Sequence, residues 1–220
     1  MTPSVDVYRR HARANVHGAR RPFMALRALI EPPSAALSPE RPLASCAPQR
    51  PFTAVATLAT AAHHGFELWA GVGLVFQPFL TLPGSIALWA TSLPALLYGA
   101  ARGGRRWDAP LAHAAGAGLA GAIVHFTIWP WELRRGVPTL TEAEGLSPDQ
   151  LPAYNFILWT WAAASALAVI RETPPGSRRW FVLGFLNAVP LRLSAKHHFA
   201  WANEQARTNP AWWNRGLQPA

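Results

Sequence analysis

The sequence predicts an all-α protein: a polytopic membrane helix bundle of four transmembrane helices, plus a short interfacial or re-entrant C-terminal helix. Four apolar stretches predict the crossings, because each approaches the roughly 20 residues that a helix needs to cross a hydrocarbon core. Arginine clusters at alternate joints predict the orientation of the bundle. Small residues at helical spacing in one stretch predict close packing of that helix against its neighbours.

The alternation of charge along the chain sets the predicted topology. The four spans cover about residues 54–76, 85–101, 109–129 and 151–170. Arginines gather before the first span, between the second and third, and after the fourth, the last two groups being Arg102, Arg105 and Arg106, and Arg171, Arg178 and Arg179. The joints at 79–84 and 132–149 are poorer in net positive charge. Because lysine and arginine collect on cytoplasmic flanks, this pattern places both termini in the cytoplasm.

The chain divides into a membrane domain and two polar ends. Residues 1–52, rich in arginine and proline, are interpreted as a disordered basic cytoplasmic tail, with translation starting at Met1 or Met24. Residues 53–191 form the membrane bundle, in which 79–84 is short enough for a tight helical hairpin. The apolar stretch 180–191 would be only about 18 Å long as a helix. It is therefore interpreted as interfacial or re-entrant, with a fifth crossing as the alternative, and residues 192–220 as a cytoplasmic tail.

Composition limits the partners. The net charge of +9 comes almost entirely from arginine, since Lys196 is the single lysine. The arginines flank apolar spans, and the chain carries no nucleic-acid-binding motif, so anionic lipid headgroups are the expected partner and nucleic acid is not. A membrane-protein partner or a second copy of the chain is compatible with the same pattern. Cys46 is the only cysteine, which excludes a disulfide or a cysteine-ligated cluster within one chain.

Two helix faces carry the polar and the small residues of the spans. In the first span, Thr57, Thr60, His64, Glu67 and Gly71 recur every three or four residues and share one stripe. In the third span the corresponding face is made of small residues and one histidine: Ala114, Gly118, Ala122 and His125. Small residues let helix backbones approach closely in a membrane, so these two stripes are expected to face the bundle interior. The G-x-G-x-x-G match at 116–121 lies inside this apolar helix and is interpreted as packing, not nucleotide binding.

Glu67 is the candidate around which a site is predicted. Apart from histidines it is the only ionisable acid or base within the four spans. A charged carboxylate at mid-bilayer costs on the order of 2.5–3.5 kcal/mol, so it needs a proton, a partner or a bound ion. His63 and His64 lie four and three residues before it, and His125 falls at nearly the same depth when residues are counted from the cytoplasmic ends. We therefore expect a buried cluster of these histidines around Glu67.

Three interpretations of this cluster stay open. In the first, the cluster is a satisfied polar contact that fixes helix register, or it binds a partner or ligand. In the second, it is a proton or cation relay through Glu67. In the third, it holds haem or a divalent metal. A second set of histidines, His113, His197 and His198, ranks below it as a metal site. We find no pattern of a hydrolytic nucleophile with its base and no phosphate-binding loop in the sequence. The sequence therefore favours a non-enzymatic integral membrane protein over a transporter or a redox protein.

Overall fold

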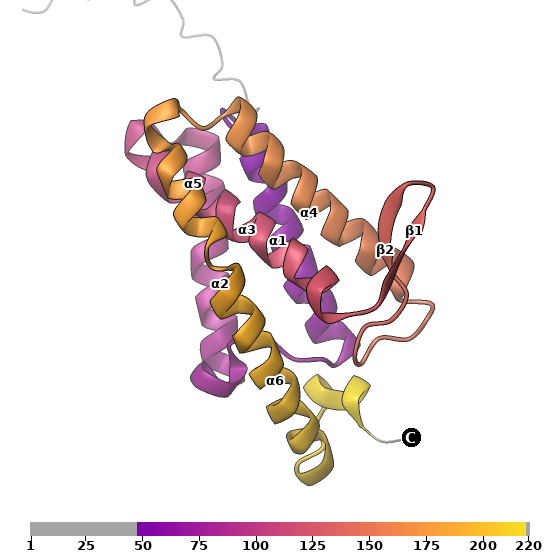
Figure 1. Ribbon diagram of the computed structural model, residues 1–220. Helices are drawn as coiled ribbons and strands as arrows, with labels where there is room; N and C mark the ends of the chain where they lie inside the picture. The colour runs from indigo at the N-terminus through magenta and orange to yellow at the C-terminus, as the bar shows by residue number, and fades with distance from the viewer. Residues whose placement is uncertain (1–47, 219–220) are drawn as a thin grey trace, which may run out of the picture. The chain divides into compact units, whose positions relative to one another are not determined.

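The structure is a computed structural model that describes residues 48–218. Six α-helices make up most of these residues. In chain order they are α1 (Pro51–Ala70), α2 (Gln77–Arg102), α3 (Asp108–Ile128), α4 (Leu151–Arg171), α5 (Arg178–Phe185) and α6 (Ala188–Thr208) (Figure 1). Short 3₁₀ turns complete the helical structure: η1 (Arg105–Trp107), η2 (Pro175–Ser177) and η3 (Trp212–Leu217). The predicted tail falls almost wholly on residues 1–47, outside the described residues.

Three helical segments are long and apolar enough to cross a membrane: Gln77–Arg102, Arg105–Ile128 and Leu151–Arg171. The expectation of a mostly helical protein with apolar spans is confirmed at this level, whereas the count of four spans is not. Helix α1, the predicted first span, is not among the three. Its twenty residues include three threonines, two histidines and a glutamate, which make it more polar than the others.

The first joint of the bundle lies earlier than the sequence predicts. Helix α1 ends at Ala70, and Gly71 adopts a left-handed conformation (φ 82°) whose N–H caps the carbonyls of Glu67 and Leu68. Glycine takes this conformation without steric cost, which is why the helix stops here. The predicted hairpin at 79–84 is instead part of α2, which bends at Thr81 (φ 61°) and continues through Pro83 and Gly84.

A core of small and aromatic residues joins α1, α3 and α4. Ala56 and Ala59 of α1 pack with Ala122 of α3 and with residues of α4 that include Leu158 and Trp161. The predicted small-residue face of α3 is used here, because Gly118 and Gly121 lie directly against the indole of Trp161, where a Cβ would be too close. Its main neighbour on that face is therefore α4.

The start of α1 is held by groups distant in sequence. The Glu172 carboxylate, just after α4, accepts hydrogen bonds from the backbone N–H groups of Phe52 (2.6 Å) and Thr53 (2.9 Å). Helix N-termini leave these donors without intrahelical partners, so Glu172 caps α1 from another element. Beside it, Arg50 pairs with Asp108 at the start of α3. These contacts gather the starts of α1 and α3 with the end of α4.

Helices α3 and α5 approach backbone to backbone. A Cβ added to Gly184 of α5 would overlap the carbonyl oxygen of His113, and one added to Gly116 of α3 would overlap that of Phe181. Both contacts exist only because neither glycine has a side chain. The pair therefore fixes where the C-terminal part of the chain joins the bundle.

The C-terminal part differs from the expected short helix and tail. The stretch 180–191 is divided between α5 and α6, which are separated at Leu186 and Asn187. Helix α6 packs against α2 and α3, and η3 packs against α1 and α6. The C-terminal segment thus comes back to the end of α1, where the Gly216 N–H donates a hydrogen bond of 3.0 Å to the Gly71 carbonyl. The start of α1 and the last described residues therefore lie at opposite ends of the bundle, whereas the sequence predicts both termini on one side (Figure 1).

A two-stranded antiparallel hairpin, absent from the all-α prediction, lies between α3 and α4. Strands β1 (Trp131–Arg134) and β2 (Val137–Leu140) pair with Trp131 opposite Leu140. The turn between them has positive φ at both Arg135 (52°) and Gly136 (80°), a geometry that matches the twist of a tight hairpin. Asn155 of α4 bonds the backbone of Leu140 through both its oxygen and its nitrogen, which ties the hairpin to the bundle.

The backbone contact between α3 and α5 leads to the first prediction. Gly116→Ala and Gly184→Ala should each lower the free energy of unfolding by about 1–3 kcal/mol, because the added Cβ overpacks a fixed backbone contact. Gly65→Ala is the matched control. A Cβ at this helical position meets nothing within 4 Å, so alanine should stabilise α1 by up to about 1 kcal/mol. Denaturation of the detergent-solubilised variants measures the change in the free energy of unfolding for each of the three. Equal changes at the three sites would contradict the packing described.

Candidate functional site

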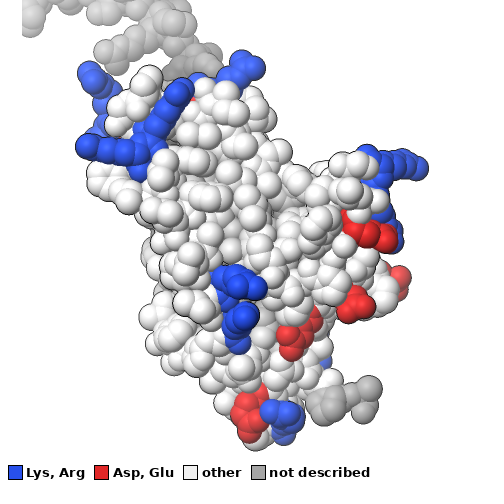
Figure 2. Space-filling model, in the orientation of Figure 1, with Lys and Arg blue, Asp and Glu red and all other residues white. Residues whose placement is uncertain are grey.

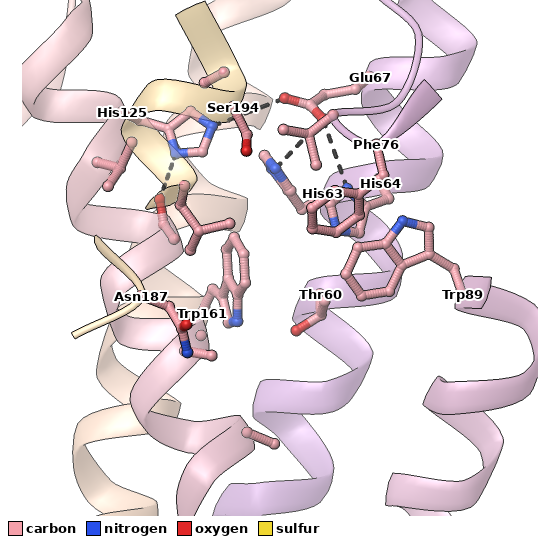
Figure 3. A pocket seen from close by; sticks show the side chains of 18 of the residues that line it. Thr60, His63, His64, Glu67, Phe76, Trp89, His125, Trp161, Asn187 and Ser194 are labelled. Carbon is pink, nitrogen blue, oxygen red and sulfur yellow. Dashed lines mark hydrogen bonds and ion pairs between the residues drawn. The ribbon is translucent and has the colours of Figure 1, made fainter. Parts of the chain in front are cut away.

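Four ionisable side chains meet near the end of α1 that is followed by Gly71. His63, His64 and Glu67 come from one turn of α1, where spacings of three and four residues bring side chains onto a common face. His125 comes from the last turn of α3. All four line one cavity (Figure 3). The structure thus places together the four residues that the sequence selects as ligand- or ion-binding candidates.

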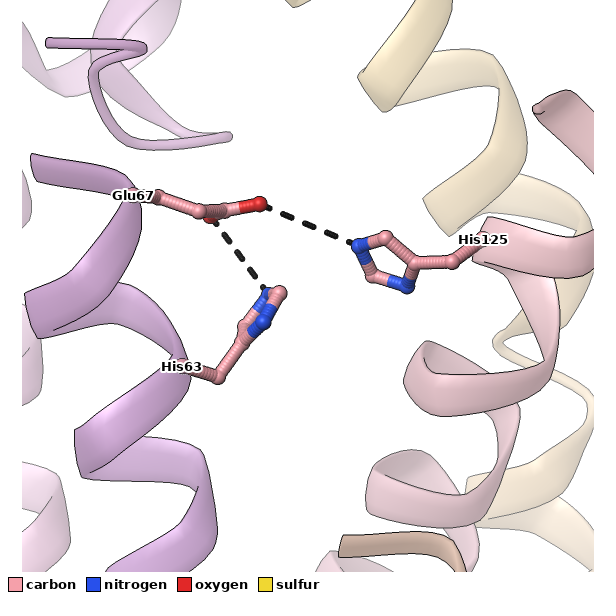
Figure 4. A group of neighbouring side chains, drawn as sticks. All are labelled: His63, Glu67 and His125. Carbon is pink, nitrogen blue, oxygen red and sulfur yellow. Dashed lines mark ion pairs between the residues drawn. The ribbon is translucent and has the colours of Figure 1, made fainter. Parts of the chain in front are cut away.

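The Glu67 carboxylate lies at the centre of the group. Its Oε2 is 3.4 Å from Nε2 of His63 and 3.7 Å from Nδ1 of His64, while its Oε1 is 3.8 Å from Nε2 of His125 (Figure 4). His63 and His64 are buried, with exposed fractions of 3% and 7%, and Glu67 is 9% exposed. The carboxyl group is therefore surrounded by imidazole nitrogens at distances longer than a normal hydrogen bond.

Tyr154 is the member of the site that the sequence analysis missed. Its hydroxyl donates a hydrogen bond of 2.8 Å to Glu67 Oε1, and its side chain is fully enclosed. The sequence does not single out Tyr154, because this residue lies near the start of the fourth span, where aromatic residues commonly mark the membrane boundary. Its position in the first turn of α4 at the depth of Glu67 is the signal that could have assigned it to the site.

The depth of Glu67 also differs from the expectation. It lies three residues before the end of α1, about 4.5 Å along the helix axis, and not near the middle of a longer span. The reason is the early stop at Gly71. Val75 and Phe76 of the segment after Gly71 line the cavity, and α6 is anchored to that segment by a 2.9 Å hydrogen bond between His198 Nε2 and the Val72 carbonyl.

The three imidazole rings differ in their hydrogen bonds and in their packing. His125 Nδ1 lies 2.7 Å from the Gly121 carbonyl oxygen, one turn earlier on α3. A carbonyl only accepts, so Nδ1 carries the hydrogen and Nε2 is directed at Glu67. Nδ1 of His63 and of His64 has no hydrogen-bond partner within the described part of the chain. His64 stacks instead on Trp89 of α2, with ring centroids 4.0 Å apart.

A cavity of about 430 Å³ adjoins this group. It is bounded by α1, α2, α3 and α6, and the four site residues occupy one end of it. Along α1 the lining begins at Thr53 and runs through Thr60 to Glu67, about 21 Å at 1.5 Å per residue. Most other lining residues are aliphatic or aromatic, among them Leu93, Leu96 and Trp161.

One part of the group has the composition and spacing of a metal site. Within residues 48–218, the only three His, Cys, Asp or Glu side chains whose potential ligand atoms all lie within 4.8 Å of one another are His63, Glu67 and His125. His113 lies apart beside Asn187, and His197 contacts Phe79. His198 lines the same cavity but bonds the Val72 carbonyl. The three lower-ranked histidines therefore do not form a second site together.

Comparison of the chain with protein-family models, with curated proteins and with solved structures gives no match. The function must therefore be argued from the geometry of this site.

The hydrogen bond from Tyr154 leads to the second prediction. Glu67→Leu should destabilise the protein by about 1–3 kcal/mol, because the buried Tyr154 hydroxyl loses its acceptor. Glu67→Gln keeps an amide oxygen for that hydroxyl and should remain close to wild type. Unfolding in detergent with EDTA present measures the difference without a contribution from bound cations. Glu132→Leu on the exposed hairpin is the control and should change stability by less than about 0.5 kcal/mol. Equal stability of the two Glu67 variants would show that the Tyr154 hydroxyl does not depend on Glu67 as its acceptor.

Proposed function

We propose that the protein is a small multi-pass integral protein of the cell membrane that binds a lipid-soluble small molecule within its helix bundle. One observation carries the proposal. The ionisable side chains that line the cavity converge around Glu67, the threonine hydroxyls along α1 are bonded within the protein, and most of the remaining wall is apolar. A molecule with an apolar body and one polar group matches that distribution. The proposed activity is binding, and it requires no catalytic group.

The size and lining of the cavity support this proposal. Small-molecule sites in proteins are concave, of about 300–1,000 Å³, and mostly apolar with a few placed polar groups. The cavity of about 430 Å³ falls within that range. The three helices that are long and apolar enough to cross a membrane, α2, α3 and α4, all contribute residues to its wall, so the cavity lies among helices suited to a bilayer.

The third prediction fills the cavity from α1. Thr60 lines it one turn before His64, and its hydroxyl bonds only the Ala56 carbonyl of its own helix. Thr60→Phe should occupy the space and reduce the small molecule that co-purifies with the protein at least about tenfold, a loss of roughly 1.4 kcal/mol of binding. Native mass spectrometry of detergent-solubilised protein detects the bound molecule.

Thr91→Phe is the matched control for this experiment. Thr91 is also helical and also bonds the carbonyl four residues earlier, but it is exposed on α2 and outside the cavity. This variant should retain the ligand as wild type does. Equal retention by both variants, or no co-purifying molecule in wild type, would contradict ligand binding in this cavity.

Charge supports an orientation for the bundle. Arg102 ends α2, and Arg105 and Arg106 follow it in η1. Arg171 ends α4 and Arg178 begins α5, at the end where Glu172 caps α1. In the view of Figure 2, one group of basic side chains lies at the upper end, others lie at the right, near the middle and at the lower end, and most of the visible acidic side chains lie in the lower half. By the positive-inside rule, the arginine-rich end faces the cytoplasm.

We infer that the C-terminal segment emerges on the other side of the membrane, in place of the cytoplasmic tail that charge alone predicts. Asn187, between α5 and α6, lies beside His113 near the start of α3, and Arg192 bonds the Thr127 carbonyl near its end. The chain thus advances along α3 away from the arginine-rich end. With α1 to α4, this passage makes an odd number of crossings.

The fourth prediction tests this topology by single-cysteine labelling in a Cys46→Ser background. Gly104→Cys, in the arginine-rich joint, should react with a membrane-impermeant reagent only from the cytoplasmic side. Asn209→Cys, after α6, and Ser147→Cys, in the exposed loop before α4, should react only from the opposite side. Reaction of Asn209→Cys from the same side as Gly104→Cys would restore the cytoplasmic C-terminus.

A further inference from the structure

We propose that His63, Glu67 and His125 bind one divalent transition-metal ion, with a coordination position left open toward the cavity. The inference rests on the proposed function in one respect: the open position is where the polar group of the cavity ligand would bind. The metal site itself depends only on these three side chains and the groups that orient them. Zn²⁺ and Co²⁺ are the ions used to test it.

The distances between the three side chains suit such an ion. With bonds of about 2.0–2.1 Å, the ligand atoms of a tetrahedral zinc site lie about 3.3–3.4 Å apart. His63 Nε2 and Glu67 Oε2 are 3.4 Å apart, and His125 Nε2 and Glu67 Oε1 are 3.8 Å apart. All three ligand groups lie within 4.8 Å of one another. The closest pair is already at that spacing, and pairs as far apart as 4.8 Å would close by up to about 1.4 Å through side-chain rotation to bond one ion.

The tautomer of His125 supports a cation in this position. Because its Nδ1–H is used by the Gly121 carbonyl, Nε2 is the nitrogen that faces the Glu67 carboxylate oxygen, and in the neutral ring Nε2 carries the lone pair. In the neutral ring, that lone pair and the carboxylate oxygen lie 3.8 Å apart with no hydrogen between them. A cation between them would turn an unfavourable approach into two bonds, and would also compensate a carboxylate that is costly to bury.

The groups behind the three ligands resemble the outer shell of a metal site. Metal-binding histidines usually donate their second N–H to a carbonyl or carboxylate, and ligating carboxylates are themselves hydrogen-bonded. Gly121 supplies the carbonyl for His125, and Tyr154 supplies a hydroxyl to Glu67 at 2.8 Å. The His63 ring packs against Trp161, with centroids 4.9 Å apart. Two of the three ligands are therefore oriented by hydrogen bonds and the third by packing.

The number of protein ligands indicates the role of the ion. Structural zinc sites are closed by four protein ligands, whereas sites with two histidines and one carboxylate keep a position for water or an exogenous molecule. All three residues line the cavity, so an exogenous donor reaches the ion from that side. The ion would recognise an oxygen or nitrogen donor on the cavity ligand. That assigns the ligand a metal-coordinating polar group at one end of an apolar body.

The fifth prediction is metal binding by the full-length protein in detergent. After EDTA treatment and its removal, wild type should bind one equivalent of Zn²⁺ by calorimetry, and Co²⁺ should give the visible absorption of a low-coordinate site. His63→Ala and His125→Ala should each weaken binding at least about 100-fold, since loss of even an outer-shell partner costs about 10–100-fold. Tyr154→Phe, which keeps all three ligands, should fall within that smaller range.

Two controls separate this site from adventitious binding. His197→Ala and His113→Ala remove exposed histidines outside the group and should leave affinity and stoichiometry unchanged. Melting in EDTA establishes that each variant is folded, and Tyr154→Phe still tests the site if an alanine variant does not fold. Wild-type affinity in folded His125→Ala, or a large loss in His197→Ala, would overturn the assignment. A metal-free wild type that still retains its small molecule would overturn the metal site alone, whereas a bound metal without a co-purifying molecule would overturn only the proposed ligand.

Discussion

The constraint on which the site depends is the burial of one carboxyl group, that of Glu67, in a bundle of apolar helices. A carboxylate loses much of its hydration when it is buried and needs polar partners in return. In this protein the partners come from three helices: His63 and His64 from α1, His125 from α3, and Tyr154 from α4. Satisfying Glu67 therefore fixes how these three helices meet at one end of the bundle.

The small residues of α3 make that meeting possible. Gly118 and Gly121 admit the indole of Trp161 against the α3 backbone, and the Gly121 carbonyl also orients His125. The same position thus serves packing and the site. On another face of α3, Gly116 admits the α5 backbone, so the C-terminal segment starts from a rigid contact before α6 reaches the cavity. Close packing at the α3 glycines therefore places α4 and α5 directly against α3, beside the cavity.

Much of the architecture could be predicted from local sequence. The apolar lengths of α2, α3 and α4 and their polar joints are properties of continuous segments, and periodicity places His63, His64 and Glu67 on one face of α1. The predicted end of the first span was wrong. The apolar character of the sequence continues past Gly71, while the helix stops where this glycine adopts a left-handed conformation. Tyr154 was missed because a tyrosine near a span end has an equally good interfacial explanation.

The sequence by itself determined the helical, membrane-suited character of the chain, the arginine-rich end, and the residues able to form a polar cluster, because each follows from composition or helical period. Only the tertiary structure decided which partners Glu67 has, that a cavity adjoins them, and that α6 and η3 return to the end of α1. Those features depend on contacts between residues as far apart as Gly71 and Gly216. Such contacts arise from complementary surfaces on different helices, and no local pattern in the chain encodes which surfaces will meet.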